Sequence, residues 1–218
     1  MVIDPAVIKP AIESYNRIVR ATHHHVTYHL PALHGLTSIQ QMRDNISGII
    51  VMGSASSVHD GHTWQEAITE LLLEAFDSNI PVMGICYGHQ LLAHICGGKV
   101  GQLWEGKKEQ GRRNVQLMEN PLWGAARSGP MIFSHQEGVT QCPDGFEITA
   151  VSDMVAVDGF ASKTKPIWGF QTHIEATQAF IDDHGIPIKN PQEAFTFGHR
   201  ILDNFIFILI SILMICVK

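Results

Sequence analysis

The sequence predicts an α/β protein with an open, doubly wound and mainly parallel sheet, to which antiparallel hairpins are added. Two observations lead to this prediction. Through the first 98 residues, short apolar runs alternate with segments of helical periodicity, as in parallel strands joined by right-handed helical crossovers. After Lys99 the helical periodicity gives way to short, strand-like runs that are typical of hairpins.

The elements of the first half follow from the spacing of their apolar residues. Four short runs that are β-branched or wholly apolar predict strands, at 1–4, 24–30, 47–53 and 80–86. Between them, apolar residues recur every three or four positions and predict helices, at 5–22, 38–46, 63–79 and 88–98. The last of these helices is expected to stop at its two glycines, Gly97 and Gly98.

The second half is predicted to contain more strands than helices. Short strands are expected at 107–120, 130–135, 146–153 and 154–160. A buried strand within 165–177 ends in polar residues, and a helical region follows it. No internal repeat, low-complexity tract or linker is visible, so residues 1–218 are predicted to form a single domain with an apolar C-terminal helix at 201–217.

The composition limits the classes of function. The chain has 218 residues, of which 45% are hydrophobic, and this is enough for one sizeable core. A net charge of −6 offers no basic face for nucleic acid, so small molecules or other proteins are the expected partners. Four cysteines without C-x-x-C spacing, and an N-terminus without a signal-peptide pattern, favour a reducing, cytoplasmic location where a thiol can act as a nucleophile.

The C-terminal stretch 205–217 is apolar except for Ser211. As a helix it would be about 20 Å long, at ~1.5 Å per residue, which is short of the ~20 residues that cross a bilayer. We expect a core helix or a subunit contact, as in a homo-oligomer. A membrane tail anchor is the alternative.

Cys86 lies between two glycines at a predicted strand-to-helix junction, in the pattern Gly84-Ile85-Cys86-Tyr87-Gly88. Ligands bind at such junctions in open α/β sheets. The pattern matches the nucleophile elbow, a turn too tight for Cβ atoms beside the nucleophile, and the helix N-terminus that follows favours a thiolate. A buried structural thiol is the alternative reading.

His173 and Glu175 supply the partners that a cysteine nucleophile needs. They directly follow the apolar run "PIWGF", at the edge of the sheet where ligands bind. Residues i and i+2 at a strand end point the same way, so Glu175 can orient the imidazole of His173.

Four separated segments resemble class I (triad-type) glutamine amidotransferases, and among these the glutaminase part of GMP synthases. The segments are "GIIVMGSASSV", "PVMGICYGHQLLAHICGGKV", "MIFSHQEGVTQCPDGFEITAVSD" and "IWGFQTHIEAT", and together they cover most of residues 1 to 180 in order and spacing. The resemblance implies a flavodoxin-like glutaminase fold and hydrolysis of L-glutamine to glutamate and ammonia. It implies no cofactor and no metal.

The resemblance also implies a role for individual residues. Cys86 would attack the side-chain amide to form a γ-glutamyl thioester, with His173 as acid and base and Glu175 as its orienting group. Backbone N–H groups of Gly53 and Tyr87 would form the oxyanion hole. The amino-acid end of glutamine would be held by Gln90, Ser134, His135, Gln136 and Glu137.

Several positions depart from the family pattern. Ile174 replaces a proline between histidine and glutamate, Ser-Ala-Ser follows Gly53 where Gly-Gly-Pro is commoner, and Glu137 stands where GMP synthases have aspartate. Because the triad residues are kept, we expect altered strand rigidity rather than lost chemistry. No S-G-G-x-D-S pyrophosphatase loop is present, so a synthetase that accepts the ammonia is expected on a separate chain.

Two other functions stay open at this point. The same triad could cut γ-glutamyl peptides with no ammonia acceptor, or the chain could be a non-catalytic relative that regulates a partner.

Two clusters of polar residues can each be explained either by a structural role or by a functional one. A solvated connection or a metal site fits the first cluster, which is His23, His24, His25, His29 and His34. A solvated hairpin or a docking face for a synthetase or an acidic second substrate fits the second, which is Lys107, Lys108, Arg112 and Arg113.

Overall fold

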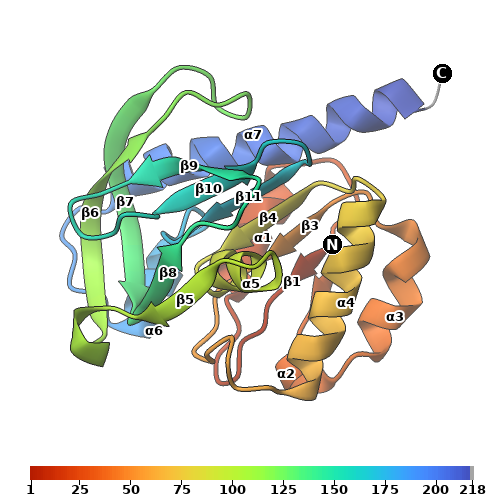
Figure 1. Cartoon of the computed structure of the whole chain (residues 1–218), viewed down its shortest axis with the longest axis horizontal. Helices are drawn as coiled ribbons and strands as arrows, with labels where there is room; N and C mark the ends of the chain where they lie inside the picture. The colour runs from red at the N-terminus through yellow and green to blue at the C-terminus, as the bar shows by residue number, and fades with distance from the viewer. Residues whose placement is uncertain (217–218) are drawn as a thin grey trace.

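The computed structural model describes the backbone of residues 1–216 and the side chains other than those of Asp44 and residues 209–216. Its centre is one nine-stranded sheet (Figure 1). The strands lie in the order β2 (Tyr28–His29), β1 (Val2–Ile3), β3 (Ile49–Val51), β4 (Val82–Ile85), β11 (Ile167–Phe170), β10 (Gly159–Ser162), β9 (Phe146–Val151), β6 (Glu109–Leu117) and β7 (Arg127–His135).

The two halves of this sheet differ in strand direction. The five strands from β2 to β11 pair in parallel, and the strands from β11 to β7 pair antiparallel. The predicted fold class, an open parallel sheet with added hairpins, is confirmed. A second, two-stranded sheet joins β5 (Lys99–Gln102) to β8 (Glu137–Gln141), and the sequence analysis did not predict either strand.

Helices cover both faces of the parallel half. One face packs against α3 (Thr37–Met42), α4 (Thr63–Asp77) and α5 (Tyr87–Ile95). The other face packs against α1 (Ile12–Arg20) and α7 (Gln192–Cys216). Successive residues of a strand enter opposite cores, as Val82 and Met83 do, which explains why β3 and β4 are apolar throughout.

The remaining helical segments are short. They are α2 (Pro31–His34), α6 (Gln178–His184) and two 3₁₀ turns, η1 (Arg43–Asn45) and η2 (Trp104–Gly106). α6 joins β11 to α7 and packs beside the carboxyl end of β11, with Phe180 against the ring of His173 at a centroid distance of 4.4 Å.

The predicted helix at 5–22 is wrong over its first part. α1 begins only at Ile12, and residues 5–11 form a loop. The buried carboxylate of Asp4 organises this loop, because it accepts hydrogen bonds from the backbone N–H groups of Ala6 (3.0 Å) and Ala11 (2.8 Å). Pro5 and Pro10 have no N–H to donate to a helix. The predicted strand at 154–160 is also mostly a turn, of which only Gly159 and Phe160 join β10.

One histidine of the first polar cluster is not solvated. His29 is buried, and its ring nitrogens lie 2.9 Å from the hydroxyl oxygens of Ser38 and Thr27. It is therefore part of the packing around β2.

The C-terminal helix begins at Gln192 rather than at residue 201. Its buried side chains Ile201, Leu202, Phe205 and Ile206 belong to the core shared with α1, so this part is a core helix. Within the described part of the chain, no helix is long and apolar enough to span a membrane. The prediction for 205–217 concerns side chains that, from residue 209 onward, lie outside the described residues.

Candidate active site

Cys86 lies at the sharp turn between β4 and α5. Its backbone has φ +52° and ψ −103°, a conformation that non-glycine residues rarely adopt, and its N–H donates to the carbonyl oxygen of Phe170 at 2.8 Å. A Cβ at Gly84 would lie 2.5 Å from backbone atoms of Gly88, and one at Gly88 would lie 2.2 Å from the carbonyl oxygen of Val51. Both flanking positions therefore require glycine, as in a nucleophile elbow.

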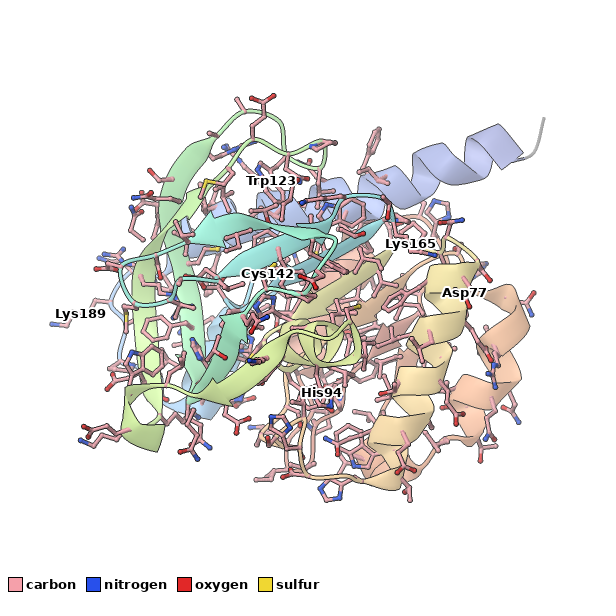
Figure 2. The ribbon with its side chains drawn as sticks, viewed as in Figure 1. Asp77, His94, Trp123, Cys142, Lys165 and Lys189 are labelled. Carbon is pink, nitrogen blue, oxygen red and sulfur yellow. The ribbon has the colours of Figure 1, made fainter. Side chains whose placement is uncertain are left out.

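The other described cysteines lie in different surroundings. Cys96 ends α5, and Cys142 follows β8 at the front of the molecule (Figure 2). Burial raises the pKa of the Cys96 thiol to about 11 and also raises the pKa of Cys142. Both side chains pack against the core that contains α4 and α5, which suits a structural role for them.

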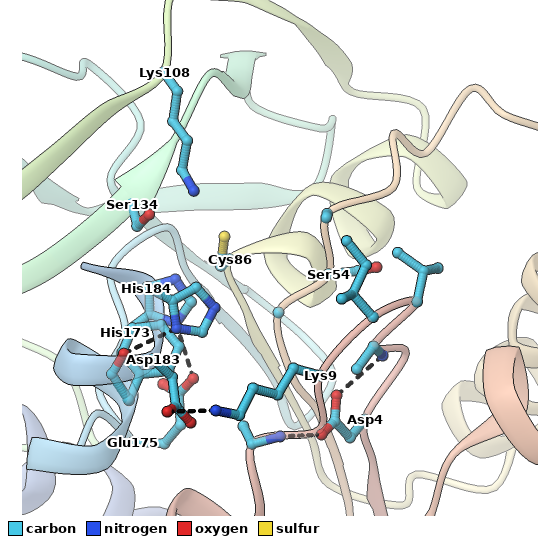
Figure 3. Close-up of a pocket in the computed structure, with 17 residues that line it drawn as sticks. Asp4, Lys9, Ser54, Cys86, Lys108, Ser134, His173, Glu175, Asp183 and His184 are labelled. Atoms are coloured by element: carbon cyan, nitrogen blue, oxygen red, sulfur yellow. Dashed lines mark hydrogen bonds and ion pairs between the residues drawn. The ribbon is translucent and has the colours of Figure 1, made fainter. Parts of the chain in front are cut away.

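The structure brings His173 and Glu175 to Cys86, although they are far apart in the sequence. His173 Nδ1 lies 2.9 Å from Glu175 Oε1, and both side chains are buried. A Cβ placed on Gly53 would lie 2.9 Å from His173 Cε1 and 3.6 Å from Cys86 Cβ, so Gly53 occupies the narrow space beside both residues. Figure 3 shows the three side chains around one cavity.

The pKa of His173 is raised to about 10. Burial by itself lowers this pKa, but the negative charges of Glu175 and Cys86, and hydrogen bonds to both, outweigh the effect of burial. The arrangement therefore favours an imidazolium cation held between a carboxylate and a thiol, as in cysteine hydrolases with a histidine base.

Asp4 places a second carboxylate near Glu175, and the sequence analysis missed it. It is buried, accepts a hydrogen bond from the hydroxyl of Tyr28 and lines the same cavity. Burial raises the pKa of Asp4, and the charge of Glu175 raises it further. The available signal was the position of Asp4 at the carboxyl end of the first strand, where polar residues of α/β proteins gather around ligands.

The cavity continues on both sides of Cys86. On the side of His173 it is lined by Asp4, Lys9, Glu175, Phe180 and residues of the loop 5–11. On the opposite side it is lined by Gln90, His135, Gln136 and Glu137. Five residues border both halves and so mark the boundary between them, namely Ser54, Ala55, Cys86, Lys108 and Ser134.

The residues predicted to hold the amino-acid end of glutamine all border this cavity. Ser134 and His135 end β7, and Gln136 and Glu137 lead into β8. Gln90, on α5, donates from Nε2 to the carbonyl oxygen of Glu137 at 2.8 Å. The predicted residues, which come from two distant segments of the chain, therefore line one wall of the cavity.

The two predicted oxyanion donors lie next to Cys86. Gly53 lies beside Cys86 and His173, and Tyr87 follows Cys86 at the start of α5. The Tyr87 side chain points away from the thiol and accepts a hydrogen bond from Gln65 at 3.0 Å. Within the described residues, neither backbone N–H has an acceptor, so both are free to donate to a ligand.

One member of the predicted basic cluster, Arg113, is not on the surface. Arg113 is buried, with an ion pair to Asp158 and its guanidinium 4.6 Å from the centre of the Phe133 ring. Arg112 lies 4.0 Å from Glu193, and Lys107 lies 3.8 Å from Glu105. Lys107, Lys108 and Arg112 are exposed as a solvated hairpin requires, and Arg113 differs because alternate residues of β6 face the core and the solvent.

Arg113 instead controls the state of His135. Its Nη1 lies 2.9 Å from His135 Nε2, and a guanidinium can only donate, so Nε2 is the acceptor and Nδ1 carries the proton. His135 Nδ1 then donates to the carbonyl oxygen of Glu137 at 2.8 Å. Burial, followed by the charge of Arg113, lowers the pKa of His135 to about 3, so the ring is neutral and holds the backbone at residue 137.

Gln171 is a further residue that the sequence analysis missed. Its Nε2 lies 3.8 Å from Cys86 Sγ, and its Oε1 accepts from Gln90 at 3.3 Å. It directly follows β11, and this placement of a polar side chain after an apolar strand was the available signal.

Comparisons with known proteins agree with this geometry. The family model "Glutamine amidotransferase class-I" matches residues 8–186. The chain is 38% identical over 146 residues to a glutamine-hydrolyzing GMP synthase of Ligilactobacillus salivarius, covering 65% of this chain and 27% of that protein. It is 33% identical over 142 residues to one subunit of the glutamine-hydrolyzing GMP synthase of Methanopyrus kandleri, covering 64% of this chain and 72% of that protein.

Solved structures show the same fold. A glutamine amidotransferase of Thermotoga maritima superposes with a TM-score of 0.71 at 17% identity, covering 96% of this chain and 97% of that one. The chain spans less than a third of the length of the first curated relatives it matches. From the family match over most of its length, the chain belongs to the class I glutamine amidotransferase family.

Proposed function

We propose that this chain is a glutaminase subunit that hydrolyses L-glutamine to glutamate and ammonia and supplies the ammonia to a synthetase on a partner chain, as in a GMP synthase. The observation that carries the proposal is the position of Cys86. It sits in a strained turn at a helix N-terminus, with the buried His173–Glu175 pair beside it in an open cavity. Residues of these types in this arrangement are suited to acyl transfer through a thioester.

In the first half of the proposed reaction, the Cys86 thiolate attacks the side-chain amide carbon of glutamine. The raised pKa of His173 keeps a proton on the imidazole beside the thiolate. His173 gives this proton to the departing nitrogen as the C–N bond breaks, which leaves ammonia and a γ-glutamyl thioester. Glu175 holds the imidazole and stabilises its positive charge.

In the second half, water replaces ammonia. Neutral His173 takes a proton from the water, the oxygen attacks the thioester carbon, and the C–S bond breaks to release glutamate. The thiolate and the imidazolium are then restored. In both halves the oxyanion would be bound by the N–H groups of Gly53 and Tyr87, and such a donor typically contributes about 3–4 kcal/mol to the transition state.

The partner is inferred from the relatives. The protein of Methanopyrus kandleri is named as one subunit of a GMP synthase, so its glutaminase is one chain of a larger enzyme. We propose the same arrangement here, with the synthetase on another chain. A cytoplasmic location remains a prediction from the sequence.

A second candidate function is hydrolysis of γ-glutamyl peptides. One observation favours it, which is that the cavity continues past Cys86 on the side of His173, where the leaving group would depart. Ammonia does not need this space, whereas the amino acid released from a γ-glutamyl peptide does.

The two functions are separated by the substrate that the purified protein turns over. We would measure glutamate and ammonia release from L-glutamine, and cleavage of a γ-glutamyl dipeptide, by the wild type, Cys86→Ala and Cys142→Ala. We expect glutamine turnover that is lost in Cys86→Ala and kept in Cys142→Ala. Cleavage of the dipeptide alone would favour the peptidase.

A protein that waits for its partner would turn over neither substrate. Labelling of Cys86 by a chloroketone analogue of glutamine, detected by mass spectrometry of the Cys86 peptide, would still support the proposed site. An unlabelled Cys86 in an inactive protein would overturn the catalytic proposal and favour a regulatory relative.

A further inference from the structure

The half of the cavity opposite His173 contains two charged side chains of opposite sign. Among the described residues that line it, these are Glu137 and Lys108. The remaining lining residues are serines, an alanine, the thiol of Cys86, two glutamines and His135, which is neutral because its pKa is lowered to about 3, chiefly by burial. A free amino acid presents one ammonium and one carboxylate, and this pair of side chains is complementary to both.

Lys108 is directed into the cavity rather than along the surface. It lies just before β6, and Figure 3 shows its side chain pointing toward Ser134 and Cys86. It borders both halves of the cavity, as Cys86 does.

The charge of Lys108 is also unneutralised, unlike that of its neighbours. Lys107, Arg112 and Arg113 each have a carboxylate within 4.0 Å. Within the part of the chain that the structure describes, Lys108 forms no ion pair. An ammonium beside a cavity without a carboxylate partner favours an anionic ligand.

We propose that Lys108 binds the α-carboxylate of the amino-acid substrate and thereby selects substrates with a free carboxylate. This inference rests on the proposed function, and it adds a positioning residue outside the segments that carry the family resemblance. Glu137 would meet the α-amino group, so the side-chain amide of glutamine would extend from this end toward Cys86.

The selectivity has a measurable consequence. Removing a hydrogen-bonded ion pair between Lys108 and the α-carboxylate should raise KM roughly tenfold. Because the head group is bound similarly before and during the reaction, KM should rise while kcat stays near its wild-type value.

The test compares Lys108→Met with Lys107→Met. Both replacements keep an unbranched apolar stem, and Lys107 is the adjacent lysine that pairs with Glu105. Cys86 labelling is followed for a chloroketone analogue of glutamine, which carries the α-carboxylate, and for iodoacetamide, which does not. KM and kcat are measured for L-glutamine and for its α-amide.

We expect Lys108→Met to slow chloroketone labelling roughly tenfold and to leave iodoacetamide labelling unchanged. It should raise KM for L-glutamine but not for the α-amide, and Lys107→Met should behave as the wild type. Equal slowing of both reagents would overturn the inference, because Lys108 would then act on the thiol. Unchanged chloroketone labelling in Lys108→Met would also overturn it.

Failure of the inference differs from failure of the proposed function. If the wild type neither turns over glutamine nor reacts with the chloroketone, the glutaminase proposal itself is wrong. If the wild type is labelled and Lys108→Met is labelled at the same rate, only the role of Lys108 is wrong.

Discussion

At the scale of single residues, Gly53 shows how little space the site leaves for change. A Cβ on Gly53 would come within 2.9 Å of His173 Cε1, which is closer than side chains tolerate. Since the obstacle is a side chain and not backbone, the imidazole can move aside while the fold survives. We therefore expect Gly53→Ala to lower the rate of Cys86-dependent turnover by roughly a hundredfold with a change in unfolding free energy below about 1 kcal/mol.

The matched control for Gly53→Ala is Gly101→Ala. A Cβ at Gly101 would lie 3.7 Å from Thr140, which is ordinary contact, so activity and stability should both stay near wild type. Turnover and urea unfolding of the two variants give the comparison. Full activity in Gly53→Ala would mean that the imidazole does not need its present position.

Catalytic candidates could be predicted from the sequence where the residues next to them form a recognisable pattern. Cys86 stands between two glycines, and His173 follows an apolar strand, so each carries a local signal. Asp4 and Gln171 also stand at the ends of apolar strands, but no glycine pattern or neighbouring partner residue marks them. Lys108 carries no local signal for the site, because it borders the cavity only through the way distant segments pack. The same reason explains Arg113, whose burial depends on which face of β6 meets Asp158.

At the scale of elements, the packing of α5 on β3 depends on Gly88. A Cβ there would lie 2.2 Å from the carbonyl oxygen of Val51 and 2.9 Å from its carbonyl carbon. Backbone atoms in the sheet cannot move aside as a side chain can, so the whole helix would have to shift. We expect Gly88→Ala to destabilise the protein by about 3 kcal/mol or more, measured by urea unfolding. Stability within about 1 kcal/mol of wild type would contradict this packing.

Strands and helices with a continuous apolar face could be predicted from the sequence. A loop whose apolar residues have helical spacing could not be distinguished from a helix. The segment 5–11 has the apolar spacing of a helix, but Asp4 and two prolines turn it into a wall of the cavity. Lys9 of this loop pairs with Asp183 on α6 at 2.6 Å, across the side of the cavity next to Glu175. β5 and β8 were missed because β5 is short and largely accessible, so it has no apolar run.

At the scale of the whole molecule, three buried histidines give stability an optimum in pH. Burial lowers the pKa of His89 and of His135 to about 3, so the folded protein resists their protonation. Their unfolded pKa is about 6.5, and the stability they contribute is therefore lost as pH falls from 6.5 toward 3. His173 acts in the opposite sense, because its pKa is raised to about 10 despite burial, by Glu175 and Cys86. Its contribution is complete below 6.5 and is lost as pH rises through 10.

Urea unfolding between pH 5 and pH 9 should therefore show the highest midpoint near pH 6.5. On the acid side, each of the two histidines with a lowered pKa contributes a loss of about 1.4 kcal/mol per pH unit once the unfolded chain binds the proton. Replacing His135 by Asn should make this slope shallower by the contribution of one histidine, whatever its effect on the stability at pH 7. The exposed His34, replaced by Gln, should leave the slope intact. An acid slope that is the same in His135→Asn and in the wild type would mean that His135 becomes protonated in the folded protein, and that burial and the charge of Arg113 do not hold it neutral.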